Sequence, residues 1–536
     1  MLGLRKGIPT WTIPWLLGGA VLILVASTAS HYGLTWDEPL YFHASDLEMQ
    51  WLKKLGQDLI GGRLADSLSD KAITEAWHWN PYRVPHPHFS RILSGASKAL
   101  LSSFMDKFLA YRLPSIFFFS LTVVVMYLWM REIFGIKTGL FTALILVLLP
   151  NLFAQAHFAM TDMPLTALWF LAAYCFWKGL QSWRWSVALG IVWGFAVATK
   201  FPGLLIPIPL ILWAHFYHRR SYGNNLFALM FLTPIVTVIA DPYLWHQTVV
   251  RFVMFLYASV SRSYRWETNF AIYFRDMLLP SSDLPWYYPF LMIGITIPEA
   301  ILFLFAIGTL ATAWAWRKQE VMALFLANAL FVPCVGLLPG AVLHDVNRLM
   351  LPALPFLAGL AGFGFLFSGE WLIRKAESLA PFGRIHHLRR RLMGGLALLV
   401  IAPSAVDMVT YHPYELSYYN RLVGGIRGAY ERGLEVTYLM EAFTPEFLRY
   451  LNERLPPNTA INASFSNFMF EYYQSESRIR RDLKITDTPE FDYYILLNRR
   501  SSFSEGDTAF LASKPALHDA WRFDGVPFIY ILKPRK

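Results

Sequence analysis

Charged residues are scarce in this chain of 536 residues: Asp, Glu, Lys and Arg together make up 16%, whereas hydrophobic residues make up 55%. Soluble proteins carry roughly a quarter charged residues, so this composition excludes an ordinary soluble multidomain protein and predicts a polytopic membrane protein. Cysteine is scarcer still. Cys175 and Cys334 both lie in apolar runs, which gives no sign of a disulfide framework or a cysteine metal site. The sequence also lacks a clear internal repeat and a low-complexity tract.

Eleven apolar segments approach the length of about 20 residues that a membrane-spanning helix needs. They cover roughly residues 12–31, 113–130, 138–158, 163–177, 185–199, 201–217, 226–243, 286–316, 321–340, 349–368 and 392–409. The first segment has no convincing signal-peptide cleavage site before Trp36, so we expect it to remain as a helix.

Basic residues gather in alternate loops between these segments, for example Arg131 with Lys137 and Arg317 with Lys318. The positive-inside rule places these loops and the N-terminus in the cytoplasm. With eleven spans, the C-terminal region is then extracytoplasmic. We therefore expect a multi-pass protein of the plasma (inner) membrane. The net charge of +10 is explained by the cytoplasmic loops, so nucleic acid is not an expected partner.

Three longer polar stretches divide the chain. We predict a membrane domain over residues 1–410, with a first outer loop at 32–111 and a second at 244–285, and a small extracytoplasmic α/β domain over 411–536. Helical spacing of apolar residues in the first loop predicts amphipathic helices on the membrane surface. In the last region, Thr444-Pro445-Glu446 predicts a capped helix start, and residues 493–497 and 528–532 predict buried strands.

Ionisable residues at membrane level are energetically costly and suggest function. The predicted topology brings a set of such residues to the outer face, although they are scattered along the chain. They are Asp37, Glu38, His86, His88, Asp162, Lys200, Arg262, Arg265, Arg275, His344, Asp345 and Arg348. A carboxylate can accept a proton from an attacking hydroxyl, and Lys or Arg can hold a phosphate and stabilise its charge as it leaves. Because no nucleotide enters this side of a membrane, the set favours transfer from a lipid-linked phosphate donor.

Several stretches together carry a family resemblance: Thr35-Trp36-Asp37-Glu38, and residues 82–95 (YRVPHPHFSRILSG), 111–115 (YRLPS), 153–165 (FAQAHFAMTDMPL), 199–201 (TKF), 348–356 (RLMLPALPF) and 415–425 (ELSYYNRLVGG). In their order and spacing the chain resembles the GT-C glycosyltransferases. The similarity is to the branch that contains the protein O-mannosyltransferases and the bacterial lipid A aminoarabinose transferase. It covers the first ten spans well and the outer domain weakly.

The resemblance implies an α-helical membrane fold of the GT-C type, with about eleven spans and juxtamembrane helices in the first outer loop. It implies inverting transfer of a sugar from a polyprenyl-phosphate carrier to a hydroxyl or phosphate acceptor. The implied catalytic residues are Asp37, as the base, with Glu38 beside it, and Asp162. The implied ligands of the carrier phosphate are Lys200, Arg265 and Arg348. The implied partners are the lipid-linked donor, membrane lipids, and a lipid, glycan or protein acceptor.

Several of these residues also have an ordinary structural interpretation. Asp162 can cap a helix, Lys200 can reach lipid headgroups, and Arg348 can pair with Asp345. His86 and His88 can contact the acceptor or a divalent metal ion, but no third ligand has a clear spacing, so the sequence establishes no cofactor.

Two other functions stay open for the whole protein. One is a transporter or flippase of lipid-linked sugars, although transporters tend to show paired halves that this sequence lacks. The other is a non-catalytic subunit of a machine that assembles surface glycans.

Overall fold

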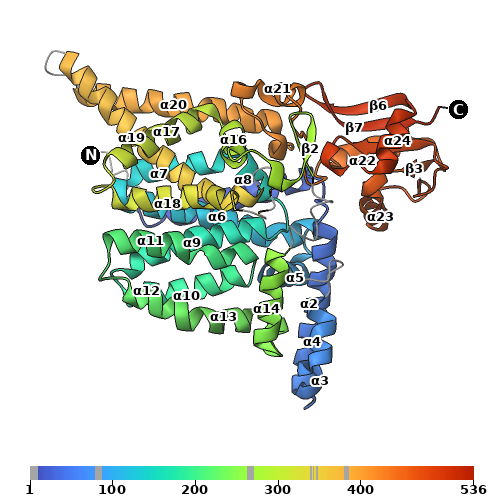
Figure 1. Ribbon diagram of the computed structural model, residues 1–536, viewed down its shortest axis with the longest axis horizontal. Helices are drawn as coiled ribbons and strands as arrows, with labels where there is room; N and C mark the ends of the chain where they lie inside the picture. The colour runs from blue at the N-terminus through green and yellow to red at the C-terminus, as the bar shows by residue number, and fades with distance from the viewer. Residues whose placement is uncertain are drawn as a thin grey trace, which may run out of the picture.

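The computed structural model describes residues 10–78, 87–261, 271–338, 341, 343, 345, 348–379 and 385–535. It is mostly helical, with a small sheet domain at the C-terminal end of the chain (Figure 1). Most of the long helices run in roughly one direction and form a bundle (Figure 1). The sheet domain lies beyond one end of this bundle.

The bundle is built from apolar helices of very different lengths. They are α1 (Ile13–Thr28), α6 (Lys107–Phe134), α7 (Ile136–Val147), α8 (Pro150–Gln155), α9 (Asp162–Gly179), α10 (Trp183–Val197), α11 (Pro207–Tyr217), α12 (Gly223–Phe227), α13 (Thr233–Ala240), α16 (Tyr288–Ile295), α17 (Glu299–Trp314), α18 (Glu320–Val335), α19 (Leu354–Leu379) and α20 (Ile385–Tyr411). Two 3-10 helices, η2 (Phe201–Leu205) and η6 (Arg348–Ala353), precede α11 and α19.

Within the described part of the chain, five helical segments are long and apolar enough to cross a membrane. They are Ile13–His31, Lys107–Phe134, Gly223–Ala240, Arg348–Ser378 and Arg391–Tyr411. Two predicted spans are broken where a proline lacks the N–H that a continuous helix needs. Segment 138–158 divides into α7 and α8 before Pro150, and segment 286–316 divides into α16 and α17 at Pro298. The number of eleven spans stays a prediction.

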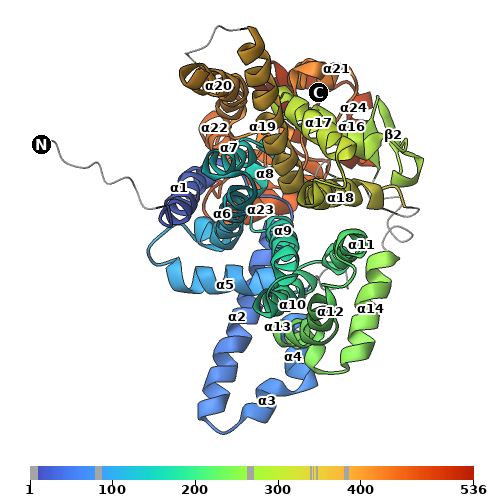
Figure 2. The ribbon, with the colours of Figure 1, turned by 90° about the vertical axis from the view of Figure 1, so that its left-hand side faces the viewer.

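The first outer loop contains the helices that its sequence pattern predicts. They are α2 (Glu38–Ile60), α3 (Leu64–Leu68), α4 (Asp70–Trp77) and α5 (Phe89–Leu101). Together with α14 (Thr248–Val260) of the second loop, α2 runs across the direction of the bundle helices, at the end nearest the sheet domain (Figures 1 and 2). Apolar side chains of α14 such as Val249 and Met254 are exposed, as on a helix that lies at a membrane surface.

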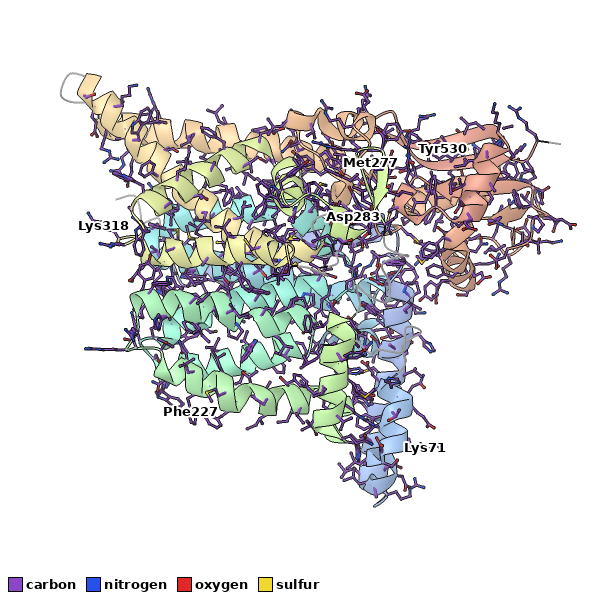
Figure 3. All side chains as sticks on the ribbon, in the orientation of Figure 1. Lys71, Phe227, Met277, Asp283, Lys318 and Tyr530 are labelled. Carbon is purple, nitrogen blue, oxygen red and sulfur yellow. The ribbon has the colours of Figure 1, made fainter. Side chains whose placement is uncertain are left out.

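Different parts of the chain lie at the two ends of the bundle. Lys318, from a predicted cytoplasmic loop, lies at the end opposite Tyr530 of the sheet domain (Figure 3). Lys71, on α4, lies toward the same end as the sheet domain. This separation agrees with the predicted topology, in which basic loops and the C-terminal domain are on different sides. Which side faces the cytoplasm stays a prediction.

The C-terminal domain holds a mixed sheet of five strands in the order β4-β3-β5-β7-β6. The strands are β3 (Ala460–Asn462), β4 (Lys484–Ile485), β5 (Tyr493–Leu497), β6 (Ala516–Phe523) and β7 (Val526–Lys533), with β3 parallel to β4 and β5, and β7 antiparallel to β5 and β6. Its helices are α21 (Gly425–Glu431), α22 (Pro445–Arg454), α23 (Asn467–Ser475) and α24 (Glu505–Ala512). A short hairpin of β1 (Ile272–Phe274) and β2 (Met277–Leu279) belongs to the second outer loop.

Local predictions for this domain are confirmed. Both predicted strands are present, as β5 and as part of β7, and β5 is buried along its whole length. The Thr444 hydroxyl accepts a hydrogen bond from the Phe447 amide at 3.3 Å, so Thr444 caps α22 as its sequence indicates.

The loop before α2 is packed directly against the C-terminal domain. The Trp36 amide donates to the Leu439 carbonyl at 3.0 Å, and the Leu34 amide donates to the Tyr473 hydroxyl at 2.6 Å. A Cβ at Gly33 would lie 2.5 Å from the Phe443 carbonyl oxygen, so only glycine permits this close approach. The C-terminal domain therefore helps to fix the position of the residues that lead into Asp37.

Candidate active site

Four of the predicted site residues meet in one place, although they are up to 311 positions apart in the chain. Arg348 donates from Nη2 to Asp37 Oδ2 at 2.6 Å and from Nε to Asp162 Oδ2 at 3.1 Å. Lys200 Nζ donates to Asp162 Oδ1 at 2.7 Å. Asp345 joins the group, because its Oδ2 accepts from Arg348 Nη1 at 3.3 Å. We refer to these five residues as the charged cluster.

Four members of the charged cluster lie at the start of a helical element, and the fifth, Asp345, lies in the turn before η6. Asp37 directly precedes α2, and Asp162 is the first residue of α9; in both helices a proline in the first turn fits the start of a helix. The positive end of a helix dipole favours a carboxylate at these positions. Lys200 directly precedes η2, and Arg348 begins η6. The starts of these helical elements therefore bring charged side chains together at one point, and no charge has to lie in the middle of a span.

Asp162 is not a helix cap, although that was an open interpretation of its position. The cap of α9 is Thr161, and the Asp162 carboxylate accepts from Lys200 and Arg348 instead. Asp162 therefore holds the two cations of the cluster beside each other.

Exposure distinguishes Asp37 from Asp162, two of the three carboxylates that pair with Arg348. The Asp37 side chain is 18% exposed, whereas that of Asp162 is 3% exposed. Asp37 is thus open to a molecule that approaches from outside, while Asp162 is enclosed between cations.

Glu38 has different surroundings from Asp37, although it is the next residue. Its carboxylate is fully buried and pairs with Arg112 through two hydrogen bonds of 2.8 Å, from Nε and Nη2. It also accepts from the backbone amides of Thr35 at 2.9 Å and Ala159 at 3.0 Å. These four bonds lead away from the charged cluster and tie the loop before α2 to α6 and to the loop before α9. The geometry gives Glu38 a positioning role, not a direct part in proton transfer.

Arg112 was not among the residues that the sequence suggested for a role. It lies inside the resemblance stretch 111–115, and its position near the start of an apolar segment was the available signal. Besides Glu38, its guanidinium donates to the carbonyls of Ala29 at 2.9 Å and Gly33 at 2.8 Å. Arg112 therefore organises the same loop that carries Asp37.

His88 lies in a second group of charged residues, separate in its contacts from the charged cluster. Its Nδ1 lies 2.9 Å from Glu48 Oε1, and its Nε2 lies 3.4 Å from Asp241 Oδ1. Arg91 also pairs with Glu48 at 3.0 Å. Burial lowers the pKa of His88 to about 3 and raises the pKa of Glu48 to about 7, the latter against the opposing effect of Arg91. His88 is therefore neutral at physiological pH.

A cavity of about 240 Å³ lies beside this second group. His78, His88, Asp241 and Arg251 contribute polar atoms to its wall, and side chains such as Phe255 make the rest apolar. Across the described residues, His, Cys, Asp and Glu form no group of three that could hold a metal ion.

Some predicted residues cannot be placed in either group. His86 and Arg265 lie outside the described residues, as do Arg262 and His344. Arg275 is described and exposed, in the turn between β1 and β2, with its guanidinium 5.5 Å from the centre of the Phe274 ring.

Part of the sequence is similar to a known family, and the fold is similar to that of solved membrane proteins. The family described as dolichyl-phosphate-mannose-protein mannosyltransferase matches residues 96–246, and no curated protein gives a significant sequence match. The crystal structure of ArnT from Cupriavidus metallidurans bound to undecaprenyl phosphate matches with a TM-score of 0.50 at 14% identity, covering 97% of this chain and 98% of ArnT. The chain has the GT-C glycosyltransferase fold. The predicted fold class is therefore confirmed, together with the multi-pass membrane character that goes with it.

Two further solved structures match this chain with lower TM-scores. The archaeal oligosaccharyltransferase AglB from Archaeoglobus fulgidus, in complex with an inhibitory peptide and a dolichol-phosphate, matches with a TM-score of 0.46 at 11% identity over 91% of this chain and 70% of AglB. The S. cerevisiae protein O-mannosyltransferase Pmt1–Pmt2 complex bound to the sugar donor matches with a TM-score of 0.29 at 17% identity over 47% of this chain and 34% of that chain. These two similarities are too weak to place individual residues.

Proposed function

We propose that this protein is an inverting glycosyltransferase. It transfers a sugar from a polyprenyl-phosphate carrier to a hydroxyl or phosphate acceptor at the outer face of the membrane. The observation that supports this function most strongly is the charged cluster, in which one accessible carboxylate, Asp37, shares a guanidinium with an enclosed one, Asp162. A base that can meet an acceptor and cations that can meet a phosphate are the two requirements of the reaction.

In the proposed reaction, Asp37 takes the proton of the acceptor group as its oxygen attacks the anomeric carbon of the donor sugar. The new bond from oxygen to carbon forms on one face, while the bond from carbon to the carrier phosphate oxygen breaks on the other, so the configuration inverts. The electron pair of the broken bond leaves with the polyprenyl phosphate. Lys200 and Arg348 stabilise the negative charge on that phosphate.

The ion pairs of the cluster explain how these cations are held for the phosphate. Lys200 and Arg348 each have an oxygen of Asp162 as a partner, so their charges are fixed before a donor enters. Preorganised charges stabilise a transition state better than charges that must first move. A donor phosphate would share these cations with Asp162. Arg265 is proposed as the additional cation that offsets the added negative charge.

Two similarities support the choice of donor. ArnT, which has the same fold over nearly its full length, was crystallised with undecaprenyl phosphate. The matching family is named for a dolichyl-phosphate-linked sugar. The acceptor is proposed only by class: a lipid, a glycan or a protein that reaches the outer face.

Replacing the proposed base tests this function. In proteoliposomes with undecaprenyl-phosphate mannose or undecaprenyl-phosphate aminoarabinose and a membrane extract as the acceptor source, Asp37→Asn should lower sugar transfer by about 10²–10⁴-fold. The matched control is Asp46→Asn, because Asp46 is also a carboxylate on α2 but pairs with Lys98 at 3.0 Å, away from the cluster. Full transfer by Asp37→Asn would overturn the assignment.

A further inference from the structure

Arg499 connects the C-terminal domain to the charged cluster, which no feature of the sequence indicated. Its Nη2 donates to Asp345 Oδ1 at 2.8 Å, while the other oxygen of Asp345 accepts from Arg348. The two side chains are nearly enclosed: Arg499 is 8% exposed and Asp345 is 1% exposed. One carboxylate is therefore shared between a guanidinium of the membrane domain and a guanidinium of the C-terminal domain.

Arg499 also reaches the residue before the proposed base. Its guanidinium carbon lies 5.7 Å from the centre of the Trp36 ring, a distance at which a cation and an aromatic face attract each other. Through Asp345 and Arg348 it acts on the Asp37 carboxylate, and through Trp36 it acts on the backbone that carries Asp37. Both routes end at the same residue.

The loop that carries Arg499 is held firmly. Arg499 follows the buried strand β5, and the Glu435 carboxylate accepts from the amides of Arg500 at 2.8 Å and Ser501 at 3.0 Å. The Asn498 side chain donates to the Pro527 carbonyl at 2.7 Å. A side chain on such a fixed loop can define the position of its partners, whereas one on a loose loop would follow them.

We propose that Arg499 is a positioning residue for the transferase reaction, so that the C-terminal domain completes the active site through the chain Arg499–Asp345–Arg348–Asp37. This inference rests on the proposed function. The physical reason is competition: without Arg499, the Asp345 carboxylate would lose one guanidinium partner and would draw the guanidinium of Arg348 more strongly, away from Asp37. A displacement of about 1 Å in a catalytic group can cost on the order of 10²-fold in rate.

A simple docking role for Arg499 is the alternative, and the protein contains a matched control for it. Arg478 of the C-terminal domain pairs with Asp106, next to the start of α6, at 2.5 Å. This ion pair joins the same two parts of the molecule but does not contact the charged cluster. If Arg499 only holds the domains together, Arg499→Ala can lower stability more than Arg478→Ala, because its ion pair is buried, but the folded protein should keep the same kcat in both variants.

The test compares kcat and KM for the lipid-linked donor in proteoliposomes of the full chain, with undecaprenyl-phosphate mannose and undecaprenyl-phosphate aminoarabinose as the probes. Arg499→Ala should lower kcat by about 10–100-fold and change KM by less than about threefold. Arg499→Lys restores a cation and should recover most of this loss. Arg478→Ala should behave like the unmodified protein. Equal kinetics for Arg499→Ala and Arg478→Ala would overturn the proposal.

A double-mutant cycle checks the route through Asp345. Asp345→Asn removes the carboxylate that competes with Asp37 for Arg348, so Arg499→Ala should lower kcat by a much smaller factor in the Asp345→Asn background than in the unmodified protein. Independent, additive effects would contradict the route. If Arg499→Ala does not fold, Arg499→Gln keeps a polar side chain and the first three carbons of arginine without its charge, and replaces Arg499→Ala in both experiments. Failure of this inference is distinguishable from failure of the function, because Asp37→Asn would still abolish transfer.

Discussion

Asp37 and Glu38 are adjacent in the sequence, but their carboxylates have different partners and different exposure. Asp37 faces the charged cluster and is partly open, whereas Glu38 is buried against Arg112. A buried ion pair adds little net stability as a pair, but removing one partner leaves an uncompensated charge, which is costly. Substitution of Glu38 should therefore mainly lower the stability of the protein, whereas substitution of Asp37 should mainly lower its activity.

Glu38→Gln should destabilise the protein by about 3–5 kcal/mol, because Arg112 would keep its buried charge without a counter-charge. Thermal unfolding in detergent measures this loss. The control is Glu132→Gln, since Glu132 pairs with Lys178 at 2.7 Å but is 41% exposed, and should change stability by less than about 1 kcal/mol. Loss of transfer by Glu38→Gln without any loss of stability would instead indicate a direct part in the chemistry.

A second buried carboxyl, Glu441, predicts a pH dependence of stability. Burial raises its pKa from 4.5 to about 7, so the folded protein binds this proton more tightly than the unfolded chain does. The resulting stabilisation is complete below about pH 4.5 and is lost as the pH rises through 7.

Glu441→Gln keeps the shape of the protonated side chain and cannot lose that proton. Its melting temperature should match the unmodified protein at pH 4 and exceed it at pH 8, by an amount that corresponds to roughly 1–3 kcal/mol. Melting curves of both proteins at the two pH values test this. Parallel loss of stability in both proteins would show that Glu441 is not the group responsible.

The residues of the charged cluster could be selected from the sequence because each interrupts an apolar pattern at the same predicted face. This signal does not exist in the C-terminal domain, where charged residues are ordinary, so Arg499 and Glu441 could not be distinguished from surface residues. The resemblance made Asp37 the base and Glu38 its neighbour, but the sequence did not reveal the ion pair of Glu38, because its partner, Arg112, is 74 positions away. Pairing across such distances depends on packing that no local pattern encodes.

At the scale of elements, the loop between α1 and α2 is fixed by contacts with the C-terminal domain. Gly33→Ala would place a Cβ 2.5 Å from the Phe443 carbonyl oxygen and 2.7 Å from the Glu441 carbonyl oxygen. Since real Cβ atoms do not approach backbone so closely, the loop would have to shift, and Asp37 with it. We expect at least a tenfold loss of sugar transfer, about what a 1.4 kcal/mol change in barrier gives.

Gly56→Ala is the matched control for Gly33→Ala. Gly56 lies on α2, and a Cβ there meets nothing within 4 Å. In a helix this substitution should leave transfer unchanged and stabilise the protein by about 0.5–1 kcal/mol. Transfer rates and melting temperatures of the two variants test the prediction. Full activity of Gly33→Ala would show that this close approach does not position the base.

The helices themselves were largely predictable, because apolar length and helical spacing mark them directly. The breaks at Pro150 and Pro298 do not follow from apolar length, which predicts continuous spans over 138–158 and 286–316. The two prolines were the sequence signal for these breaks. The strand order of the C-terminal sheet was not predictable, since parallel pairing of β3 with β4 and β5 joins segments that no sequence signal links.

At the scale of the whole molecule, different residues of the charged cluster bind the carrier and carry out the chemistry. Lys200→Met removes one of the two cations proposed for the carrier phosphate. Its affinity for undecaprenyl phosphate should fall by about 10–100-fold, the value of a lost charge-assisted hydrogen bond. Binding of undecaprenyl phosphate to the purified protein measures this. Unchanged affinity would remove Lys200 from the phosphate site.

The most direct measurement follows binding and single-turnover transfer in the same preparation of the Asp37→Asn variant. Asparagine keeps the size of the side chain and a group that can bond to Arg348, but it cannot take a proton. We expect the affinity of this variant for undecaprenyl phosphate to stay within about threefold of that of the unmodified protein, while the rate of transfer falls by about 10²–10⁴-fold. Transfer at the normal rate would contradict the assignment of Asp37 as the base.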